Sequence, residues 1–518
     1  MFPRFPSSGD DQPLYKVVRD LSGGLNTQMH EQIIGDNQAT NLSNVVLDTS
    51  GQRSLRAGST LIEDLGATAG TGLFGLEPEG GTNQLIANSG EFFKWYSGSG
   101  AFASITSLAS TFNFTLPCTF VKALESDLGE VAIIQNGTNN ALRLDPATPA
   151  FQDCADTNTS PPLTTVHTWF RDRYWTLNSN KLSYSGAIPA DFSNTFARDT
   201  NYFNIPVGIE RALLGLRDTG LIIAGSDQIW GLNPAIVPAP DTDKPEKLLD
   251  IGVLNGNTME QVSDDVFFLS YDGVRGLFRT QQDKLQLGRS KPLSYYLKDE
   301  FEEINLTYIS KADAIYWDGK YFLTLPTGNS TYNNKIWVCY PNLRDSEGIP
   351  AWVTFTGLNI AYFAKCKFSG EERLYGIDAV DGKVYRLMNG TSDNGVAVEY
   401  LEEGRAEDFG KPLQSKWGGE FKLRVAGGTG TLVVSASIDN GGYTQLGSVA
   451  LEESGVEFPL TFPLDFRGDN EVSEQFHLDT LGTFKRIKFK IYANTLNQQI
   501  TILESLATTF LEEYQSED

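Results

Sequence analysis

The sequence predicts an all-β protein in which a β-propeller of six to eight blades is joined to a β-rich platform domain. One β-hairpin pattern recurs in phase through the middle of the chain, which predicts the blades. The composition agrees, because 50 Gly residues suit many tight turns and 31 Phe, 20 Tyr and 8 Trp suit aromatic β cores. Apolar and polar residues alternate near the C-terminus, and this alternation predicts the platform.

The hairpin is clearest in residues 209–234. Two short apolar runs, LIIA at 221–224 and QIWGL at 228–232, are separated by the turn residues GSD at 225–227. Six other stretches repeat this design. Their turns fall at Ser89-Gly90, Asn136-Gly137, Ser179-Asn180, Asp272-Gly273, Asn333-Asn334 and Asp381-Gly382.

The spacing of these seven turns is typical of a repeat architecture. Five of the six intervals are 42 to 48 residues long and one is 62. A period of about 40–50 residues with several short strands indicates propeller blades, which must stack because none buries both faces alone. A long β-sandwich, or two of them, is the alternative, because sandwiches also have strands at regular spacing.

Changes of composition divide the chain into four parts. Residues 1–13 are rich in Pro, Ser, Gly and Asp and are expected to form a flexible arm. Residues 14–64 form an N-terminal platform segment, 65–404 the propeller, and 405–518 a C-terminal β-sandwich or platform domain. Neither end has a complete core of its own, so we expect the two to share one domain.

Helices are expected at two places only. Asp36 could cap a short helix at 37–44, between strands expected at 15–19 and 45–47. Residues 290–306 are the best helical candidate, because Leu293, Leu297 and Phe301 recur at a spacing of four.

Charge and cysteine content restrict the function. The net charge is −24, which argues against stable binding to nucleic acid, since that requires clustered Lys and Arg. The four Cys residues have no metal-ligand spacing and are expected to be buried free thiols, as in a reducing compartment. No apolar run approaches the roughly 20 residues of a transmembrane segment, and the N-terminus lacks the pattern of a secretory signal.

No constellation of catalytic, metal-binding or cofactor-binding residues stands out, so we expect no enzymatic activity, no metal and no cofactor. His30, His167 and His477 are far apart in the sequence. The segment 437–443 (SIDNGGY) partly matches the Asp-box turn of sialidase-like propellers, but it occurs once and is better interpreted as a hairpin turn. The Asp-Gly turns offer one carboxylate each, too few for a calcium loop; they begin at Asp272, Asp318 and Asp381.

Several phrases resemble a class of virion proteins of tailed bacteriophages. The N-terminal segment contains GGLN at 23–26, DNQATNLSNV at 36–45 and LRAG at 55–58. Three longer phrases follow in the same order as in that class, at 171–192, 251–277 and 314–340. With these motifs the chain is similar to the nozzle, or tail tubular, proteins of short-tailed phages.

The resemblance implies a structural role in the virion tail after assembly in the host cytoplasm. It implies a homo-oligomeric ring, usually a hexamer, that ends the tail tube below an adaptor ring and beside tail fibres or spikes. Genomic DNA would pass through the lumen transiently and without stable binding. The alternatives are a glycan-binding or glycan-degrading propeller, such as a tail spike or glycosidase, and a cellular propeller scaffold, which would lack the N-terminal phrases. The sequence singles out no partner-binding residue.

Overall fold

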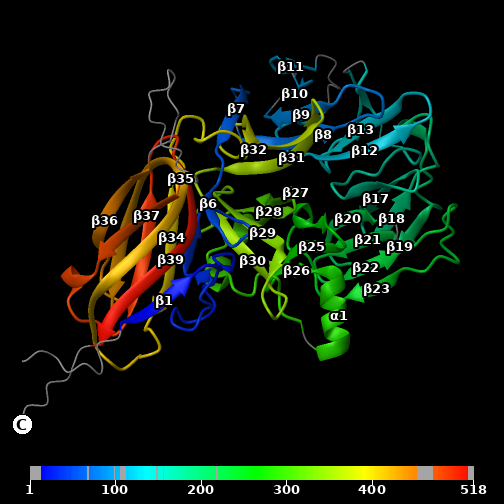
Figure 1. Ribbon diagram of the computed structural model, residues 1–518. Helices are drawn as coiled ribbons and strands as arrows, with labels where there is room; N and C mark the ends of the chain where they lie inside the picture. The colour runs from blue at the N-terminus through cyan, green and yellow to red at the C-terminus, as the bar shows by residue number, and fades with distance from the viewer. Residues whose placement is uncertain are drawn as a thin grey trace, which may run out of the picture.

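The computed structural model describes residues 13–66, 69–90, 92–98, 100–105, 112–147, 150–155, 157–216, 220–288, 290–451 and 471–511. The chain is all-β and consists of a propeller and a β-rich platform built from both ends of the chain (Figure 1). The predicted fold class is therefore confirmed. The expected flexible arm, apart from its last residue, and the C-terminal residues 512–518 lie outside the described residues.

Six small antiparallel sheets stand around one axis as blades (Figure 1). Four of them are uninterrupted in sequence and have four strands each, and the fifth has three. These are β8–β11 (Gly70–Leu76, Gln84–Ser89, Phe92–Tyr96, Ala103–Ser104), β12–β15 (Thr119–Glu125, Gly129–Gln135, Leu142–Asp145, Ala150–Asp153), β16–β19 (His167–Phe170, Arg173–Asn178, Lys181–Tyr184, Tyr202–Asn204), β20–β23 (Glu210–Leu216, Gly220–Gly225, Ile229–Leu232, Glu246–Leu249) and β24–β26 (Glu260–Val262, Asp265–Ser270, Gly273–Gly276).

The sixth small sheet closes the propeller with strands from distant parts of the chain. Strands β31–β33 (Ile360–Phe368, Glu371–Asp378, Lys383–Leu387) are completed by β7 (Ser59–Asp64), which pairs antiparallel with β33. Strand β7 falls within the segment 14–64 that we assigned to the platform, but it lies in the propeller. The ring is thus closed by hydrogen bonds between an early and a late strand.

A seventh set of strands belongs to both parts of the molecule. Strands β27–β30 (Asp313–Trp317, Lys320–Leu325, Lys335–Arg344, Pro350–Phe355) stand in the ring between β24–β26 and β31–β33. Their outer strand β30 pairs in parallel with β4 (Asn41–Ser43), which pairs with β34 (Tyr400–Glu407) of the platform. One 14-stranded sheet therefore runs from the propeller into the platform.

Strand β35 (Lys416–Ile438) is the central strand of the platform. Its first part pairs with β37 (Glu471–His477) and β39 (Gln499–Leu511), and its last part pairs with β36 (Thr444–Leu451) and β38 (Ile487–Ala493). The N-terminal strand β1 (Leu14–Val18) pairs along β39, as does β6 (Arg53–Leu55), which carries β5 (Val45–Leu47). Strands β1 and β39, the first and last strands of the described residues, thus lie side by side (Figure 1).

All seven predicted hairpins form. Each supplies two adjacent strands of one set in the propeller, namely β9–β10, β13–β14, β17–β18, β21–β22, β25–β26, β28–β29 and β32–β33. At the third turn both Ser179 (φ 53°) and Asn180 (φ 60°) are left-handed, as a two-residue hairpin turn requires.

Both predicted helices are wrong. Residues 37–44 form the short strands β3 (Gln38–Ala39) and β4, because β3 pairs with β2 (Gly24–Leu25) and β4 pairs with β34. In residues 290–306 the α-helix is limited to the one-turn α2 (Lys298–Glu302), and a 3-10 helix begins at Leu306. The backbone N–H of Leu293 donates to Val274, and the carbonyl of Tyr296 accepts from Thr27. Because these two backbone groups bond to distant residues, they are not available for the hydrogen bonds of a longer helix.

The one longer helix in the described residues is α1 (Leu277–Leu287), which ends at the left-handed Gly288 and projects from the propeller (Figure 1). The remaining helical segments of the described residues are short 3-10 helices: η1 (Phe192–Asn194), η2 (Gly256–Thr258), η3 (Leu306–Lys311) and η4 (Asp479–Leu481).

Candidate functional site

The innermost strands of the propeller enclose a central cavity of about 390 Å³. Residues from all seven inner strands line it, so it lies on the propeller axis. Its charged side chains come from four successive inner strands, with Arg211 on β20, Glu260 on β24, Asp313 on β27 and Lys365 on β31. The opposite wall is mainly apolar and aromatic, with Phe74 and Phe120 stacked at 5.4 Å between ring centroids; this pair belongs to β8 and β12.

The two carboxyl groups of the cavity are both disfavoured in their charged forms. Burial raises the pKa of Glu260 to about 7, although the nearby Lys365 acts in the opposite direction. Burial also raises the pKa of Asp313 well above its usual value, and the Glu260 charge adds to the rise. Asp313 Oδ2 accepts a hydrogen bond of 2.8 Å from the backbone N–H of Phe363, which ties β27 to β31. Asp313 therefore also has a structural role, because it joins two neighbouring inner strands.

His167 also lines the cavity, but its ring nitrogens are both occupied. Nε2 lies 2.8 Å from Thr119 Oγ1 and Nδ1 lies 2.7 Å from the Tyr174 hydroxyl. That hydroxyl accepts a hydrogen bond from the Gln135 amide. Burial lowers the pKa of His167 to about 3, so the ring is neutral at physiological pH. His167 links two neighbouring blades and offers no free base.

The described parts of the chain show no other candidate among the residues considered from sequence. His30 and His477 do not join His167, and no group of three or more His, Cys, Asp or Glu side chains in these parts could hold a metal ion. All four cysteines are buried free thiols, as predicted.

The Asp-box-like segment is a hairpin turn between β35 and β36. Ser437 Oγ donates to the Gly441 carbonyl at 2.7 Å. Asp439 accepts hydrogen bonds from the backbone N–H groups of Lys485 and Arg486, which attaches the turn to the start of β38. The Asp439 carboxylate therefore belongs to a turn and also binds the backbone of a neighbouring segment.

The Asp-Gly turns carry ion pairs with the basic residue that follows each of them. The pairs are Asp272–Arg275, Asp318–Lys320 and Asp381–Lys383. Each carboxylate is thus engaged within its own turn, which fits the interpretation as turn residues.

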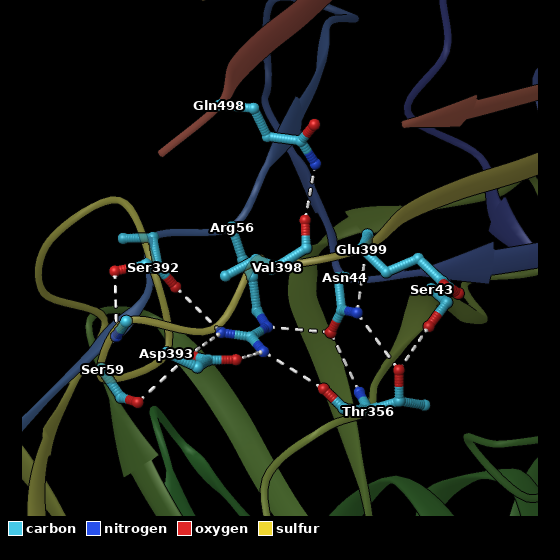
Figure 2. A network of polar contacts seen from close by, with 12 residues as sticks. Ser43, Asn44, Arg56, Ser59, Thr356, Ser392, Asp393, Val398, Glu399 and Gln498 are labelled. Carbon is cyan, nitrogen blue, oxygen red and sulfur yellow. Dashed lines mark hydrogen bonds and ion pairs between the residues drawn. The ribbon is translucent and has the colours of Figure 1, made fainter. Parts of the chain in front are cut away.

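The second candidate region is the junction between propeller and platform, where a buried polar network surrounds Arg56 (Figure 2). The Arg56 guanidinium forms an ion pair with Asp393 and donates to the carbonyl of Thr356 at 3.1 Å. Its side chain is only 1% exposed, and it lies over the Phe355 ring at 5.4 Å. The network thus connects the N-terminal segment with the end of β30 and with the linker that leads to β34.

Asn44 completes this network because it uses both ends of its side-chain amide. Its Oδ1 accepts from Arg56 Nε at 2.8 Å and from the Thr356 backbone N–H at 2.9 Å. Its Nδ2 donates to Thr356 Oγ1 and to the Glu399 carbonyl. The backbone of Asn44 is left-handed, with φ 58°, a conformation that Asn tolerates better than most residues.

Arg53 forms a second buried link on the platform side. It pairs with Glu402 of β34, and the two side chains are 2% and 8% exposed. It also donates to the backbone carbonyls of Leu21 and Asn37, each at 2.7 Å. The other Glu402 oxygen accepts from the Tyr400 hydroxyl at 2.7 Å.

An apolar core surrounds these links and crosses the junction. It includes Leu42 and Val45 from the N-terminal segment, Phe355 and Ile360 from the propeller, and Leu423 from the platform. The N-terminal phrases are visible in the sequence, but the sequence does not predict that their polar residues are buried at this junction. The signal was present in the two arginines on either side of Leu55.

Comparisons with known proteins give a fold likeness only. No family model and no curated protein matches the chain. Among solved structures, an ancestral GH74 enzyme is 10% identical with a TM-score of 0.40, covering 68% of this chain and 51% of that one. YCF48 from Cyanidioschyzon merolae is 11% identical with a TM-score of 0.37, covering 64% and 98%.

A chain in the mitotic checkpoint complex is 10% identical with a TM-score of 0.35, covering 75% of this chain and 99% of that one. With 51% of the GH74 enzyme covered, this chain spans about half the length of that enzyme. At these identities and TM-scores, none of the three neighbours carries a conclusion about function. In the described residues no helix has the length and apolar character needed to cross a membrane.

Proposed function

We propose that this protein is a structural component of a bacteriophage tail, the nozzle ring that ends the tail tube and through which genomic DNA leaves. The observation that carries the proposal is the position of the nozzle-like N-terminal phrases. Gly24, Asn44 and Arg56 from these phrases lie at the joint where the propeller meets the platform. They are therefore among the residues that join the two parts.

A rigid joint suits a protein that must transmit force in a ring. A continuous sheet, a shared core and the buried ion pair Arg56–Asp393 connect the parts, so their relative motion would expose apolar area and unpaired charges. Subunits built this way would keep their shape while DNA passes. The ring is expected to be a homo-hexamer in contact with an adaptor ring and with fibres or spikes.

Two measurements test the proposal. Native mass spectrometry and negative-stain imaging of the full chain, alone and with the other tail proteins of its virion, should show closed rings. Antibodies against the platform should label the tail end of intact virions. A chain that stays monomeric with its tail partners and is missing from purified virions would exclude the role.

The glycan-degrading alternative has one feature in its favour, the pair of carboxyl groups Glu260 and Asp313 in one cavity. Glycoside hydrolysis uses two such groups with different roles. Release of reducing sugar from host surface polysaccharide, abolished in Glu260→Gln, would favour this alternative over the nozzle. We expect no release.

A further inference from the structure

Arg211 lines the central cavity at an irregular point of the inner strand β20. The pairing of β20 with β21 shifts register between Glu210 and Ala212, so Arg211 is the extra residue of a β-bulge. Such bulges re-aim a side chain and are frequent next to binding sites. The Arg211 carbonyl lies so close to Gly256 that a Cβ there would approach it to 1.8 Å. The position therefore depends on a glycine in the adjoining turn.

Bulges recur at the cavity in two other inner strands. Strand β8 shifts register between Gly70 and Gly72, and β31 shifts between Ile360 and Tyr362. Both strands contribute lining residues immediately after the shift, including Leu73 and Tyr362. The wall of the cavity is thus irregular where a plain propeller strand would be straight.

The Arg211 guanidinium has no protein partner in the described part of the chain. Its Nε is buried without a hydrogen bond, and no hydrogen bond or ion pair of the guanidinium was found there. Arg53 and Arg56 differ sharply, since each makes an ion pair and several hydrogen bonds. An arginine keeps its charge in proteins. Arg211 as a whole is half-buried and only its Nε is a buried atom without a partner, so the terminal nitrogens remain available to a bound anion.

Neither carboxyl group of the cavity forms an ion pair with Arg211. Glu260 and Asp313 lie on the next two inner strands, but no ion pair within 4.0 Å joins either of them to Arg211. Lys365 donates to the Tyr316 carbonyl at 3.2 Å and adds a second positive charge at the cavity. His167 is neutral and fully bonded. The cavity therefore offers a cationic donor that neither of its two carboxyl groups binds directly.

We propose that the central cavity binds a small oxyanion, a carboxylate or phosphate group, on the Arg211 guanidinium. The fork of N–H groups on arginine matches the two oxygens of such a group. A volume of about 390 Å³ accommodates a small molecule. Glu260, when protonated, can donate a further hydrogen bond to the anion. A metal cation would be repelled by Arg211 and Lys365. The inference does not rest on the virion role.

Isothermal titration calorimetry of the full chain in an anion-poor buffer tests the site, with inorganic phosphate and malonate as separate probes. We expect saturable binding of one probe, and the preferred probe distinguishes phosphate from carboxylate chemistry. Arg211→Gln should weaken binding at least about tenfold, as expected for charge-assisted hydrogen bonds. Arg211→Lys should recover part of the affinity. Arg19→Gln removes the same charge from a side chain that is 80% exposed and should bind like the wild type.

The pH and the unliganded stability provide two further readouts. Binding should strengthen from pH 8 to pH 6, because Glu260 takes up a proton in this range. Without anion, Arg211→Gln should unfold at the same temperature as the wild type or higher. The proposal is wrong if neither probe binds saturably or if Arg211→Gln binds unchanged. It is also wrong if this variant unfolds earlier than the wild type, or fails to fold, without anion.

Discussion

Arg56 Nε donates a hydrogen bond of 2.8 Å to Asn44 Oδ1, and through this contact the residues before and after β5 and β6 bind the propeller and the platform together. The guanidinium is at the same time paired with Asp393. A left-handed asparagine and a buried arginine therefore act as one unit (Figure 2).

Breaking this unit should destabilise the protein strongly. Arg56→Gln leaves Asp393 as a buried carboxylate without its cation, which should lower the free energy of unfolding by about 3–5 kcal/mol. Denaturant unfolding followed by tryptophan fluorescence measures the change. The control is Arg19→Gln, whose ion pair spans 3.8 Å at the surface and should matter by less than about 0.5 kcal/mol. Equal stability of the two variants would contradict the structural role of Arg56.

Gly24 should not tolerate a side chain. Its φ is +75°, and a Cβ would lie 2.8 Å from the backbone N and O of Trp352 in β30. Gly24→Ala therefore adds a steric clash of about 1–3 kcal/mol to the cost of a left-handed alanine. Gly80→Ala is the matched control, since Gly80 has φ +69° with nothing within 4 Å. Thermal unfolding that ranks Gly80→Ala as the less stable variant would refute this prediction.

The stability should depend on pH through Glu260. The folded-state pKa of about 7 lies above the unfolded value of about 4.5, so the folded protein holds this proton more tightly. The stabilising contribution is complete below pH 4.5 and is lost as the pH rises to 7. Glu260→Gln should remove this loss, so its stability relative to wild type should rise by about 1–3 kcal/mol between pH 4.5 and pH 8. Urea unfolding at the two pH values measures it, and a constant difference would contradict it.

The purified protein should not retain duplex DNA. Its net charge of −24 disfavours contact with phosphates, and an acidic lumen would let DNA move without sticking. We expect lumen-facing loops to carry more Asp and Glu than Lys and Arg. A gel-shift assay at about 150 mM salt, where screening acts beyond about 8 Å, should show no complex. A shifted band, or a ring lined at its narrowest point by Lys or Arg, would overturn the account.

The sequence predicted the parts of the fold that depend on local chemistry. Turns such as Ser179-Asn180 require residues that accept positive φ, and these residues are visible in the sequence. Residues 37–44 were misassigned because the strand β4 exists only through pairing with distant strands. Helix α1 was not predicted, although Gly288 marks its end. The spacing of Leu293 and Leu297 favoured a helix in the segment that follows it.

The candidate site was less predictable than the fold. Arg211 is visible as a charged residue at the head of an apolar strand, but no spacing rule brings it to Glu260 and Asp313. These residues meet only because successive inner strands surround one axis. Likewise Arg53 and Arg56 have partners in Glu402 and Asp393, more than 300 residues later. Such convergence is a property of the closed ring and cannot be read from neighbouring residues.

The closure of the last blade by β7 has a consequence for synthesis on the ribosome. Ser59 and Asp393 are joined by a side-chain hydrogen bond but are 334 residues apart in the chain. Strand β7 has no partner strand until β33 has been translated, which is late in synthesis. Contacts of such long sequence separation slow folding, and an unpaired strand edge can associate with other chains in the meantime. Nascent chains cut off before β33 should accordingly aggregate, whereas full-length chains should become resistant to proteases only after release.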